Sequence, residues 1–342
     1  MSCKLSETTI NGMKAIFIEN DRLKIGILPD RGCDIFEFRY KPMDIDFLLR
    51  LSKGILNPQT HFSQIRNTKN QFEDYYYGGW QVCLPNSAPF NYRGAELGQH
   101  GEVSLIPWKI ENIKTEHDIV SVTLSASPLR LPLKVERSLT LRGNSGSLEI
   151  QERVLNVGKT ELSIMWGQHI AFGLPFIDDE VVIDTNAKTM NTELSMPEHH
   201  RFKRGETFQW PDARNKNDES DDARIINLKK TGAYSDLCYL EGYPREAFYA
   251  IRNKKKNIGF SLTWNGEIFK TLWLWTELGA TKDFPWWGDC YTIALEPWTS
   301  RWTANPREAI DNKEWLTLNA GEAVEVNFIA TTFEDEFNPI TL

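Results

Sequence analysis

The 342-residue sequence predicts an all-β fold, one large antiparallel β-sandwich of many strands with few short helices. Three observations support this prediction. Apolar and polar residues alternate over residues 120–124, 260–264 and 324–328, which is typical of half-buried strands. The segment 135–154 has the pattern of a hairpin, and helical periodicity is nearly absent from the chain.

The hairpin over residues 135–154 permits a prediction of strand register. Asn144 and Ser145 form the centre of a turn flanked by glycines, and apolar residues on the two arms then share one face. With this turn centre, Arg137 lies opposite Glu152, and both charges fall among the apolar positions of their strands. We therefore predict a cross-strand ion pair at least partly sheltered from water. The alternative is an ion pair on an edge strand in solvent.

A second hairpin is predicted between residues 247–252 and 258–264. The intervening residues 253–257 contain three consecutive lysines between two asparagines. A lysine run at the tip of a hairpin is usually a solvated turn, so it carries little weight as a phosphate site.

One short helix is expected near the end of the chain. Asn305 is its predicted N-cap, Pro306 takes the first helical position, and residues 307–310 form one or two turns. Residues 57–77 and 200–223 are polar stretches and are predicted to be long loops, which in a compact protein tend to be functional or mobile.

Composition limits the classes of function. Acidic residues outnumber basic ones by 47 to 39, and no basic stripe is present, so nucleic-acid binding is not expected. No apolar run approaches the roughly 18 residues that span a bilayer, and residues 1–7 lack the apolar core of a signal peptide. No repeat or change of composition marks a boundary, so residues 1–342 are expected to form a single domain.

The cysteines indicate a reducing compartment. Their number is odd, their spacing is irregular, and no CxxC pair occurs, so we expect reduced thiols in a cytoplasmic protein instead of a disulfide frame or a zinc site. They are Cys3, Cys33, Cys83, Cys238 and Cys290.

Aromatic residues make up 12% of the chain, which is high for a generic core. Four segments combine polar and aromatic residues where core strands should be apolar, namely residues 78–86, 92–103, 165–173 and 291–298. Four tryptophans lie in or near them: Trp80, Trp166, Trp275 and Trp298. This clustering favours a cleft in which sugars stack on aromatic faces while their hydroxyls find polar partners.

Glu296 is the strongest candidate for chemistry in these segments. It follows the apolar residues 293–295 and precedes Pro297, so its carboxylate should be buried, which is costly unless the group is paired or used. Burial would also raise its pKa toward the range of a general base. The alternative is a structural salt bridge to an arginine such as Arg301.

Two histidines belong to the same segments. His169 lies between aromatic residues, a setting in which a lone histidine is more often structural than catalytic. His100 follows Glu96 by four residues, but the glycines around it argue against the helix that would make this spacing a metal site. His199 and His200 are a weak metal candidate, and no metal site is predicted.

Motifs of the common nucleophilic, zinc-dependent and nucleotide-binding enzymes are absent. The sequence has no GxSxG, no HExxH, no Walker loop, and no GxGxxG after a strand. These absences leave acid–base chemistry by a carboxylate and an imidazole, with tryptophan and tyrosine as platforms for a sugar.

In their order along the chain, these motifs resemble the aldose 1-epimerase (galactose mutarotase-like) superfamily. The similarity covers nearly the whole chain and is carried by residues 27–35, 78–86, 93–103, 166–172, 295–297 and 316–322. It implies a supersandwich of antiparallel strands with an open, concave sugar site. It also implies a reaction that needs no cofactor and no metal, the interconversion of the α and β anomers of an aldose.

The resemblance also implies roles for individual residues. Glu296 corresponds to the general base that takes the proton of the anomeric hydroxyl, and His169 to the acid that protonates the ring oxygen. His100 matches a second histidine that holds the sugar, and Asp236 matches a carboxylate that binds sugar hydroxyls. Further sugar contacts are expected from Gln81, Asn86, Arg93, Trp166 and Trp275.

The sequence departs from the well-studied mutarotases in two places. Their arginine in a Gly-Arg-x-x-Asn setting has no counterpart between Gly79 and Asn86, and Gln168 replaces the asparagine that often precedes their catalytic histidine. The chain is therefore more similar to the uncharacterised branch of the superfamily, which leaves the sugar open.

Two other functions stay open beside a mutarotase. One is a non-catalytic sugar-binding protein or sensor on the same fold. The other is a different carbohydrate-active enzyme, such as a lyase, a hydrolase or a hexose-phosphate epimerase. In each case the expected partner is a small sugar, and the protein is expected to be a monomer or a homodimer.

Overall fold

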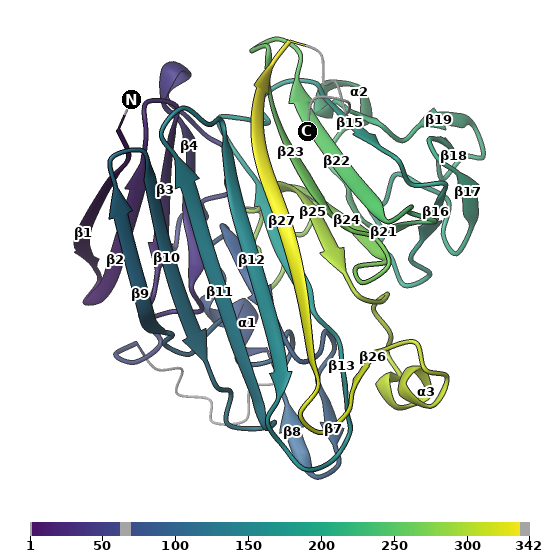
Figure 1. The fold of residues 1–342 in the computed structure, drawn as a ribbon. Coiled ribbons are helices and arrows are strands. Elements are labelled where there is room, and N and C mark those ends of the chain that lie inside the picture. The colour runs from purple at the N-terminus through teal and green to yellow at the C-terminus, as the bar shows by residue number, and fades with distance from the viewer. Residues whose placement is uncertain (1, 62–69, 336–342) are drawn as a thin grey trace.

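A computed structural model describes residues 2–61 and 70–335 of the chain. Two large antiparallel sheets pack face to face, and only short helices accompany them (Figure 1). The predicted all-β sandwich is therefore confirmed. No helix in the described ranges has the length and apolar character needed to cross a membrane.

The larger sheet has 14 strands and carries the N-terminal part of the chain at one end. In spatial order its strands are β1 (Lys4–Ile10), β2 (Met13–Glu19), β3 (Leu23–Leu28), β4 (Asp34–Tyr40), β6 (Trp80–Cys83), β14 (Gly167–Phe172), β25 (Tyr291–Trp298), β24 (Thr271–Leu278), β21 (Ser235–Glu241), β16 (Thr189–Thr192), β17 (Thr207–Gln209), β18 (Asp212–Arg214) and β19 (Ser220–Asp222), and β5 (Ile45–Asp46) pairs with β4.

The second sheet has nine strands. In spatial order they are β20 (Ile225–Ile226), β15 (Val181–Thr185), β22 (Glu246–Asn253), β23 (Ile258–Asn265), β27 (Ala323–Glu334), β12 (Ser147–Asn156), β11 (Leu133–Arg142), β10 (Ile119–Ala126) and β9 (Lys109–Glu116). Two small sheets pair β13 (Leu162–Ile164) with β26 (Leu316–Leu318), and β7 (Phe90–Tyr92) with β8 (Ala95–Leu97). The helices are α1 (Gln71–Tyr75), α2 (Leu228–Thr231), α3 (Pro306–Asp311) and the 3₁₀ turn η1 (Lys41–Met43).

The main core lies between the two large sheets, and a second apolar cluster covers the outer face of the 14-stranded sheet. On β25, Leu295 belongs to the main core, whereas Ala294 and Trp298 belong to the outer cluster. Because successive side chains of a strand point to opposite faces, Glu296 must share the outer face with Ala294 and Trp298. The strand is buried on both faces, which explains why it reads as a nearly continuous apolar run.

The predicted hairpin over residues 135–154 is confirmed as β11 and β12, with Arg137 opposite Glu152. The two side chains form an ion pair at 2.9 Å and are 0% exposed, so the sheltered alternative is correct. Gln168 on the facing sheet donates to Glu152 at 2.8 Å and accepts from the indole of Trp80 at 2.8 Å. This polar chain crosses the core and ties β12 to β14, the strand that carries His169.

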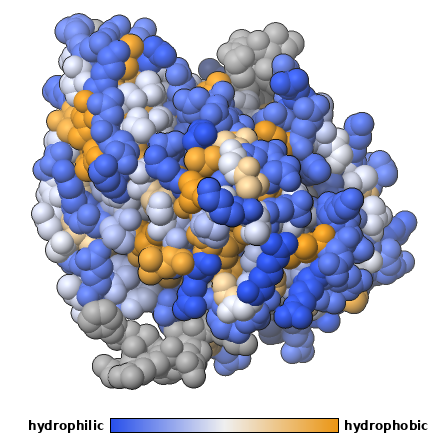
Figure 2. All heavy atoms as spheres, turned by 60° about the horizontal axis from the view of Figure 1, so that its bottom comes forward, coloured by the Kyte–Doolittle hydropathy of each residue, from blue (hydrophilic) through white to orange (hydrophobic). Residues whose placement is uncertain are grey.

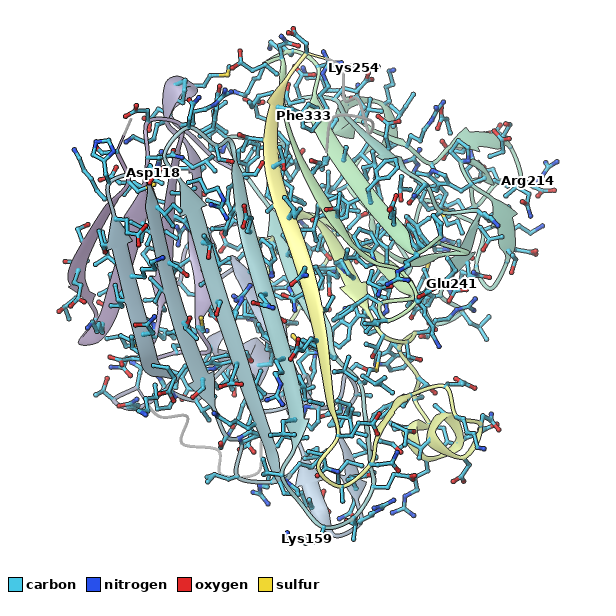
Figure 3. All side chains as sticks on the ribbon, in the orientation of Figure 1. Asp118, Lys159, Arg214, Glu241, Lys254 and Phe333 are labelled. Atoms are coloured by element: carbon cyan, nitrogen blue, oxygen red, sulfur yellow. The ribbon has the colours of Figure 1, made fainter. Side chains whose placement is uncertain are left out.

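The second hairpin is confirmed as β22 and β23. Figure 3 shows Lys254 at the tip of this hairpin, at one end of the molecule. Lys254, Lys255 and Lys256 each pair with an acidic side chain of residues 178–180. The lysine run is thus a surface turn neutralised by a neighbouring acidic turn, in agreement with the prediction.

The predicted helix exists as α3, but Asn305 makes no side-chain hydrogen bond to its backbone. Asn305 is nevertheless the N-cap residue and Pro306 begins the helix, as predicted, while the Asn305 amide donates to the carboxylate of Glu308 at 3.0 Å. Residues 200–223 are not a plain loop. They contain β17, β18 and β19, which extend the large sheet to the edge where Figure 3 labels Arg214. Three-residue strands of polar composition carry too little alternation to be recognised in the sequence.

Residues 57–77 were predicted to form the other long loop. Their described part contains α1, whose five residues cover one side of the outer apolar cluster through Phe72. Residues 62–69 of this segment lie outside the described residues.

Candidate active site

A cavity of about 440 Å³ opens on the outer face of the 14-stranded sheet. Figure 2 shows hydrophobic residues gathered in the middle of one face of the molecule, within hydrophilic surroundings. The described residues that line the cavity come from segments far apart in sequence, and they are Phe72, Glu73, Ser87, Ala88, Pro89, Gln99, His100, His169, Glu193, Ser195, Met196, Pro197, Ser235, Asp236, Leu237, Trp273, Trp275, Trp286, Glu296 and Trp302.

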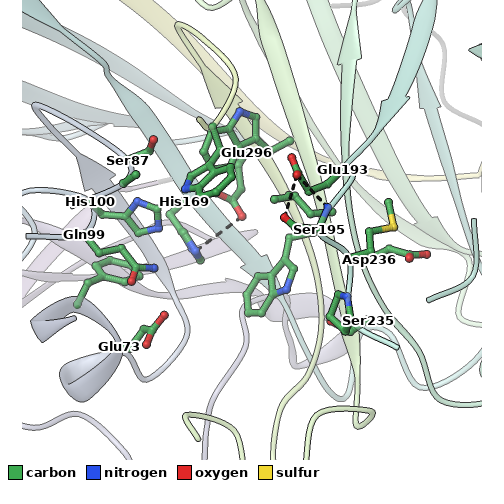
Figure 4. A pocket seen from close by; sticks show the side chains of 18 of the residues that line it. Glu73, Ser87, Gln99, His100, His169, Glu193, Ser195, Ser235, Asp236 and Glu296 are labelled. Carbon is green, nitrogen blue, oxygen red and sulfur yellow. Dashed lines mark hydrogen bonds and ion pairs between the residues drawn. The ribbon is translucent and has the colours of Figure 1, made fainter. Parts of the chain in front are cut away.

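His169 and Glu296 meet within this cavity. The register of β14 against β25 pairs Gly167 with Trp298 and Ala171 with Ala294, which places residues 169 and 296 opposite each other on the outer face. Their side chains approach to 3.7 Å between Nε2 and Oε1 (Figure 4). Both are nearly fully buried, at 5% and 2% exposure. Two strands that are far apart in the chain thus bring a carboxylate and an imidazole together.

Burial sets the protonation of this pair. It raises the pKa of Glu296 to about 8, because the charged carboxylate loses its hydration, and the hydrogen bond from Trp298 Nε1 at 3.0 Å offsets only part of this. The same loss of hydration lowers the pKa of His169 to about 3. Between these values the pair holds one proton, and the order of the pKa values places it on Glu296. A carboxyl whose pKa lies near neutral pH can give and take a proton readily.

His100 lies beside the pair on a tight turn. Its ring centroid is 5.6 Å from that of His169 and 5.3 Å from that of Trp298. The turn depends on Gly101, which has a φ of +69° and would place a Cβ only 2.0 Å from the backbone oxygen of Leu84. Burial and the neighbouring His169 hold the pKa of His100 well below its usual value, so the ring is neutral at physiological pH. Its Nδ1 is buried with no hydrogen-bond partner in the described structure.

Aromatic rings form much of the remaining wall. Trp273 stacks on Trp298 with ring centroids 4.5 Å apart and an angle of 18° between the planes. The ring centroids of Trp275 and Trp286 are 5.4 Å apart, and those of Tyr76 and His169 are 5.0 Å apart. Such rings exclude water from the reactive pair and offer apolar faces to a ligand.

The family model described as "Domain of unknown function (DUF4432)" matches residues 10–331. The chain belongs to the DUF4432 family. A comparison with curated proteins finds no match for it.

Solved structures show what fold this DUF4432 member shares. A structure from Klebsiella pneumoniae named "putative aldose 1-epimerase" is 14% identical, with a TM-score of 0.70 over 98% of this chain and 85% of that chain. A galactose mutarotase-like protein from Clostridium acetobutylicum is 18% identical, with a TM-score of 0.66 over 98% and 99% of the two chains. A galactose mutarotase related enzyme from Lactobacillus acidophilus is 17% identical, with a TM-score of 0.61 over 95% and 99%. The fold of this DUF4432 chain is therefore galactose mutarotase-like, as the resemblance in the sequence indicated.

Five of the nine residues singled out from the sequence of this DUF4432 chain line the cavity. They are His100, His169, Asp236, Trp275 and Glu296. The carboxylate of Asp236 is already engaged by the backbone of another segment. Asp236 pairs with Thr276 on β24, one position out of phase with Trp275, and its carboxylate accepts the backbone N–H of Arg201 at 3.1 and 3.2 Å. Burial raises the pKa of Asp236 to about 7, and the contacts with Arg201 oppose this rise.

The other four singled-out residues lie outside the described lining, contrary to the sequence-based expectation. Gln81 lies opposite His169 in the sheet, and its amide nitrogen donates to Asp34 and to the backbone of Gly78, so its donors are already used, while its Oε1 has no hydrogen-bond partner in the described structure. Asn86 donates to two backbone carbonyls and shapes the turn that carries His100.

Arg93 and Trp166 lie outside the cavity lining for different reasons. Arg93 lies on the surface and donates to the backbone oxygen of Glu161. Trp166 is fully buried and packs edge-on against Phe269 in the main core, so it faces the wrong side of the sheet. Both residues lie close in sequence to residues of the site, but the path of the chain directs the side chain of Arg93 to the surface and that of Trp166 into the main core.

Sequence reasoning missed several lining residues. Trp273 could have been found, because it lies two positions before Trp275 on the same strand and so shares its face. Phe72 lies on the short helix α1, and Ser87, Glu193 and Ser195 lie in or beside turns. None of them carried a pattern of its own, since only the fold determines the path of these segments.

Polar side chains line the cavity on both sides of Glu296. Figure 4 shows Glu73, Ser87, Gln99 and His100 on one side of Glu296, and Glu193, Ser195 and Asp236 on the other. Within the described ranges, no group of three or more His, Cys, Asp or Glu side chains is arranged to hold a metal ion. The two sides flank the His169–Glu296 pair, in which a buried carboxyl with a pKa of about 8 lies 3.7 Å from a neutral imidazole.

Proposed function

We propose that this protein is a cofactor-independent aldose 1-epimerase, which interconverts the α and β anomers of an aldose or aldose derivative. The observation that carries the proposal is the His169–Glu296 pair, buried and 3.7 Å apart in a cavity walled by tryptophans. The names of proteins with the same fold support the proposal, because several of them refer to galactose mutarotase or aldose 1-epimerase.

The reaction needs two proton transfers. Glu296 as carboxylate takes the proton from the anomeric hydroxyl while His169 as imidazolium gives a proton to the ring oxygen. The bond between the anomeric carbon and the ring oxygen breaks, and the electron pair of the deprotonated hydroxyl forms the aldehyde. Rotation about the adjacent carbon–carbon bond presents the other face of the aldehyde. Reclosure with both transfers reversed then yields the other anomer and returns each proton.

The proton inventory is consistent with the pKa values. The pair of carboxylate and imidazolium contains the same single proton as the pair of carboxyl and imidazole that the pKa values of about 8 and 3 favour. A sugar hydroxyl that donates to Glu296 favours its carboxylate form, and a ring oxygen that accepts from His169 favours the imidazolium. Binding of the sugar therefore moves the proton in the direction that the reaction requires.

The surrounding groups have supporting roles in this proposal. The tryptophans of the wall offer faces for the C–H groups of the sugar, and the unpartnered Nδ1 of His100 and Oγ of Ser87 offer hydrogen bonds to its hydroxyls. Ring opening exposes a reactive aldehyde, so a cavity that excludes water also protects the intermediate.

The test is the rate at which a freshly dissolved single anomer reaches equilibrium, followed by polarimetry or NMR over a panel of aldoses. The wild-type protein should accelerate at least one of them, and Glu296→Gln should lose roughly 10²- to 10⁴-fold of that acceleration. Equal rates for the wild type and Glu296→Gln with every sugar would refute the proposal. If the sugars quench tryptophan fluorescence but show no acceleration, the protein is a sugar-binding protein on the same fold.

A further inference from the structure

The side of the cavity opposite His100 carries a carboxylate that the proposed reaction does not use. Glu193 lines the cavity just beyond the end of β16. The hydroxyl of Tyr239 donates to its Oε2 at 2.7 Å, and Ser195 donates to its Oε1 through its backbone N–H at 3.2 Å and its hydroxyl at 2.9 Å. Neutral donors thus hold the carboxylate in place, and no Lys or Arg of the described residues pairs with it.

The ionisable side chains of the lining favour a cationic ligand over an anionic one. Four of the described lining residues are acidic, namely Glu73, Glu193, Asp236 and Glu296, whereas no described lining residue is Lys or Arg. Glu296 holds the proton that it shares with His169 near neutral pH, and burial raises the pKa of Glu73 and of Asp236, so Glu193 is the carboxylate placed to meet a cation. The nearby cations are engaged elsewhere: Arg201 pairs with Asp221, and Arg301 pairs with Glu241. A phosphate, sulfonate or carboxylate on the sugar would enter this cavity without a cationic partner, which is costly away from water.

The aromatic wall is the second feature that suits a cation. Trp273, Trp275, Trp286 and Trp302 all line the cavity, and Trp275 and Trp286 lie 5.4 Å apart at an angle of 34°. The faces of tryptophan rings attract ammonium groups. The carboxylate of Glu193 lies in the same lining and can accept a charge-assisted hydrogen bond from such a group.

An independent observation shows that the cavity is built for a polar ligand. The Oγ of Ser87, Nδ1 of His100 and Nδ1 of His169 are buried, and none has a hydrogen-bond partner in the described structure. All three side chains are more than nine-tenths buried, and all three residues line the cavity. Buried polar atoms without partners are costly, so a ligand with several hydroxyl groups would relieve that cost.

We infer that the substrate is an aldose with a protonated amino group, and that Glu193 and the tryptophan wall bind its ammonium group. This inference rests on the proposed function, because it names the class of sugar that the same cavity accepts. The hydroxyls of the sugar then face His100 and the reactive pair, while the ammonium group lies on the Glu193 side. Sugars with an anionic substituent are poor substrates for the same electrostatic reason.

The experiment compares kcat/KM for anomer equilibration of glucosamine with glucose, galactosamine with galactose, and glucose 6-phosphate with glucose, below the pKa of the sugar amine. We expect the amino sugars to exceed their neutral counterparts at least tenfold, because a charge-assisted hydrogen bond is stronger than a neutral one. Glu193→Gln keeps the size and acceptor oxygen of the side chain and should reduce this preference roughly 10- to 100-fold. Glu198→Gln is the matched control, since it removes the same charge from an exposed residue of the same segment that does not line the cavity.

The outcomes separate this inference from the proposed function. Acceleration of neutral or phosphorylated sugars equal to or greater than that of amino sugars would overturn the inference and leave the epimerase proposal standing. A preference for amino sugars that Glu193→Gln does not reduce would overturn the role of Glu193. If no aldose reaches equilibrium faster than in buffer, the proposed function fails, and the inference fails with it.

Discussion

The hydrogen bond from Trp298 to Glu296 makes the pH dependence of the proposed reaction predictable. In the wild-type protein, kcat/KM should be level near neutral pH and fall above a pKa of about 8, where the Glu296–His169 pair loses its single proton. One unit above that pKa, only about a tenth of the molecules retain the proton, so kcat/KM at pH 9 should be about a tenth of its neutral value.

Trp298→Phe removes the donor and keeps an aromatic ring. The indole N–H donates to Glu296 Oε2 at 3.0 Å, which favours the charged carboxylate and lowers its pKa. Hydrogen bonds to charged groups contribute about 1.5–3 kcal/mol, so losing this one should raise the pKa of Glu296 by roughly 1 to 2. The fall in kcat/KM then moves to roughly pH 9–10, and the variant retains at least about half of its neutral kcat/KM at pH 9.

The assay is kcat/KM for anomer equilibration measured from pH 6 to pH 10 with a substrate found in the panel. Trp273→Phe is the matched control, because it alters the other ring of the same stack, and its N–H donates to the backbone of Ser300 and not to Glu296. The control should keep the fall near pH 8. If the kcat/KM of Trp298→Phe also falls near pH 8, and both variants are folded by circular dichroism, then Glu296 is not the group whose loss of a proton causes the fall.

Three further predictions concern the scaffold around the site. Arg137→Met leaves the carboxylate of Glu152 buried without its cationic partner and should lower the free energy of unfolding by about 3–5 kcal/mol, measured by urea titration. The double variant with Glu152→Leu should recover most of that loss, and equal stability of the single and double variants would contradict this. Gly101→Ala should cost at least about 1–2 kcal/mol of stability and reduce kcat/KM. The residue has a φ of +69°, and the new Cβ would lie 2.0 Å from the backbone oxygen of Leu84, so the turn that carries His100 must shift. Wild-type thermal stability of this variant would argue against this prediction. Arg93→Ala should leave kcat/KM within about twofold of the wild type, because the side chain lies on the surface outside the cavity; a larger loss would place it in the site.

Two kinds of sequence signal proved reliable in this chain. The turn centred on residues 144 and 145 set the register of its hairpin, and that register correctly placed Arg137 opposite Glu152. The position of Glu296 at the end of an apolar run predicted its burial and the direction in which its pKa moves. Both are local properties, because neighbours in one strand or one hairpin decide them.

The predicted sugar contacts were wrong for residues whose side chains could point to either face of a sheet or bond to a neighbouring segment. Trp166 and Trp275 both lie in or near aromatic, polar segments, yet Trp166 is in the main core and Trp275 is on the outer face. Gln81 and Asn86 are polar and buried as expected, but nearby residues already occupy most of their hydrogen-bonding groups. The sequence shows the type of each side chain, but not which groups compete for it.

By itself, then, the sequence determined that the protein is an all-β sandwich, that Glu296 is buried, and that His100 and His169 belong to the same polar, aromatic segments as the candidate base. Strand alternation and hairpin turns encode these features over a few residues. Only the tertiary structure decided that residues 169 and 296 lie opposite each other and that Glu193 faces them across the cavity. The physical reason is that the site forms between strands and turns distant in the chain, whose relative positions depend on how the whole sheet is ordered and packed.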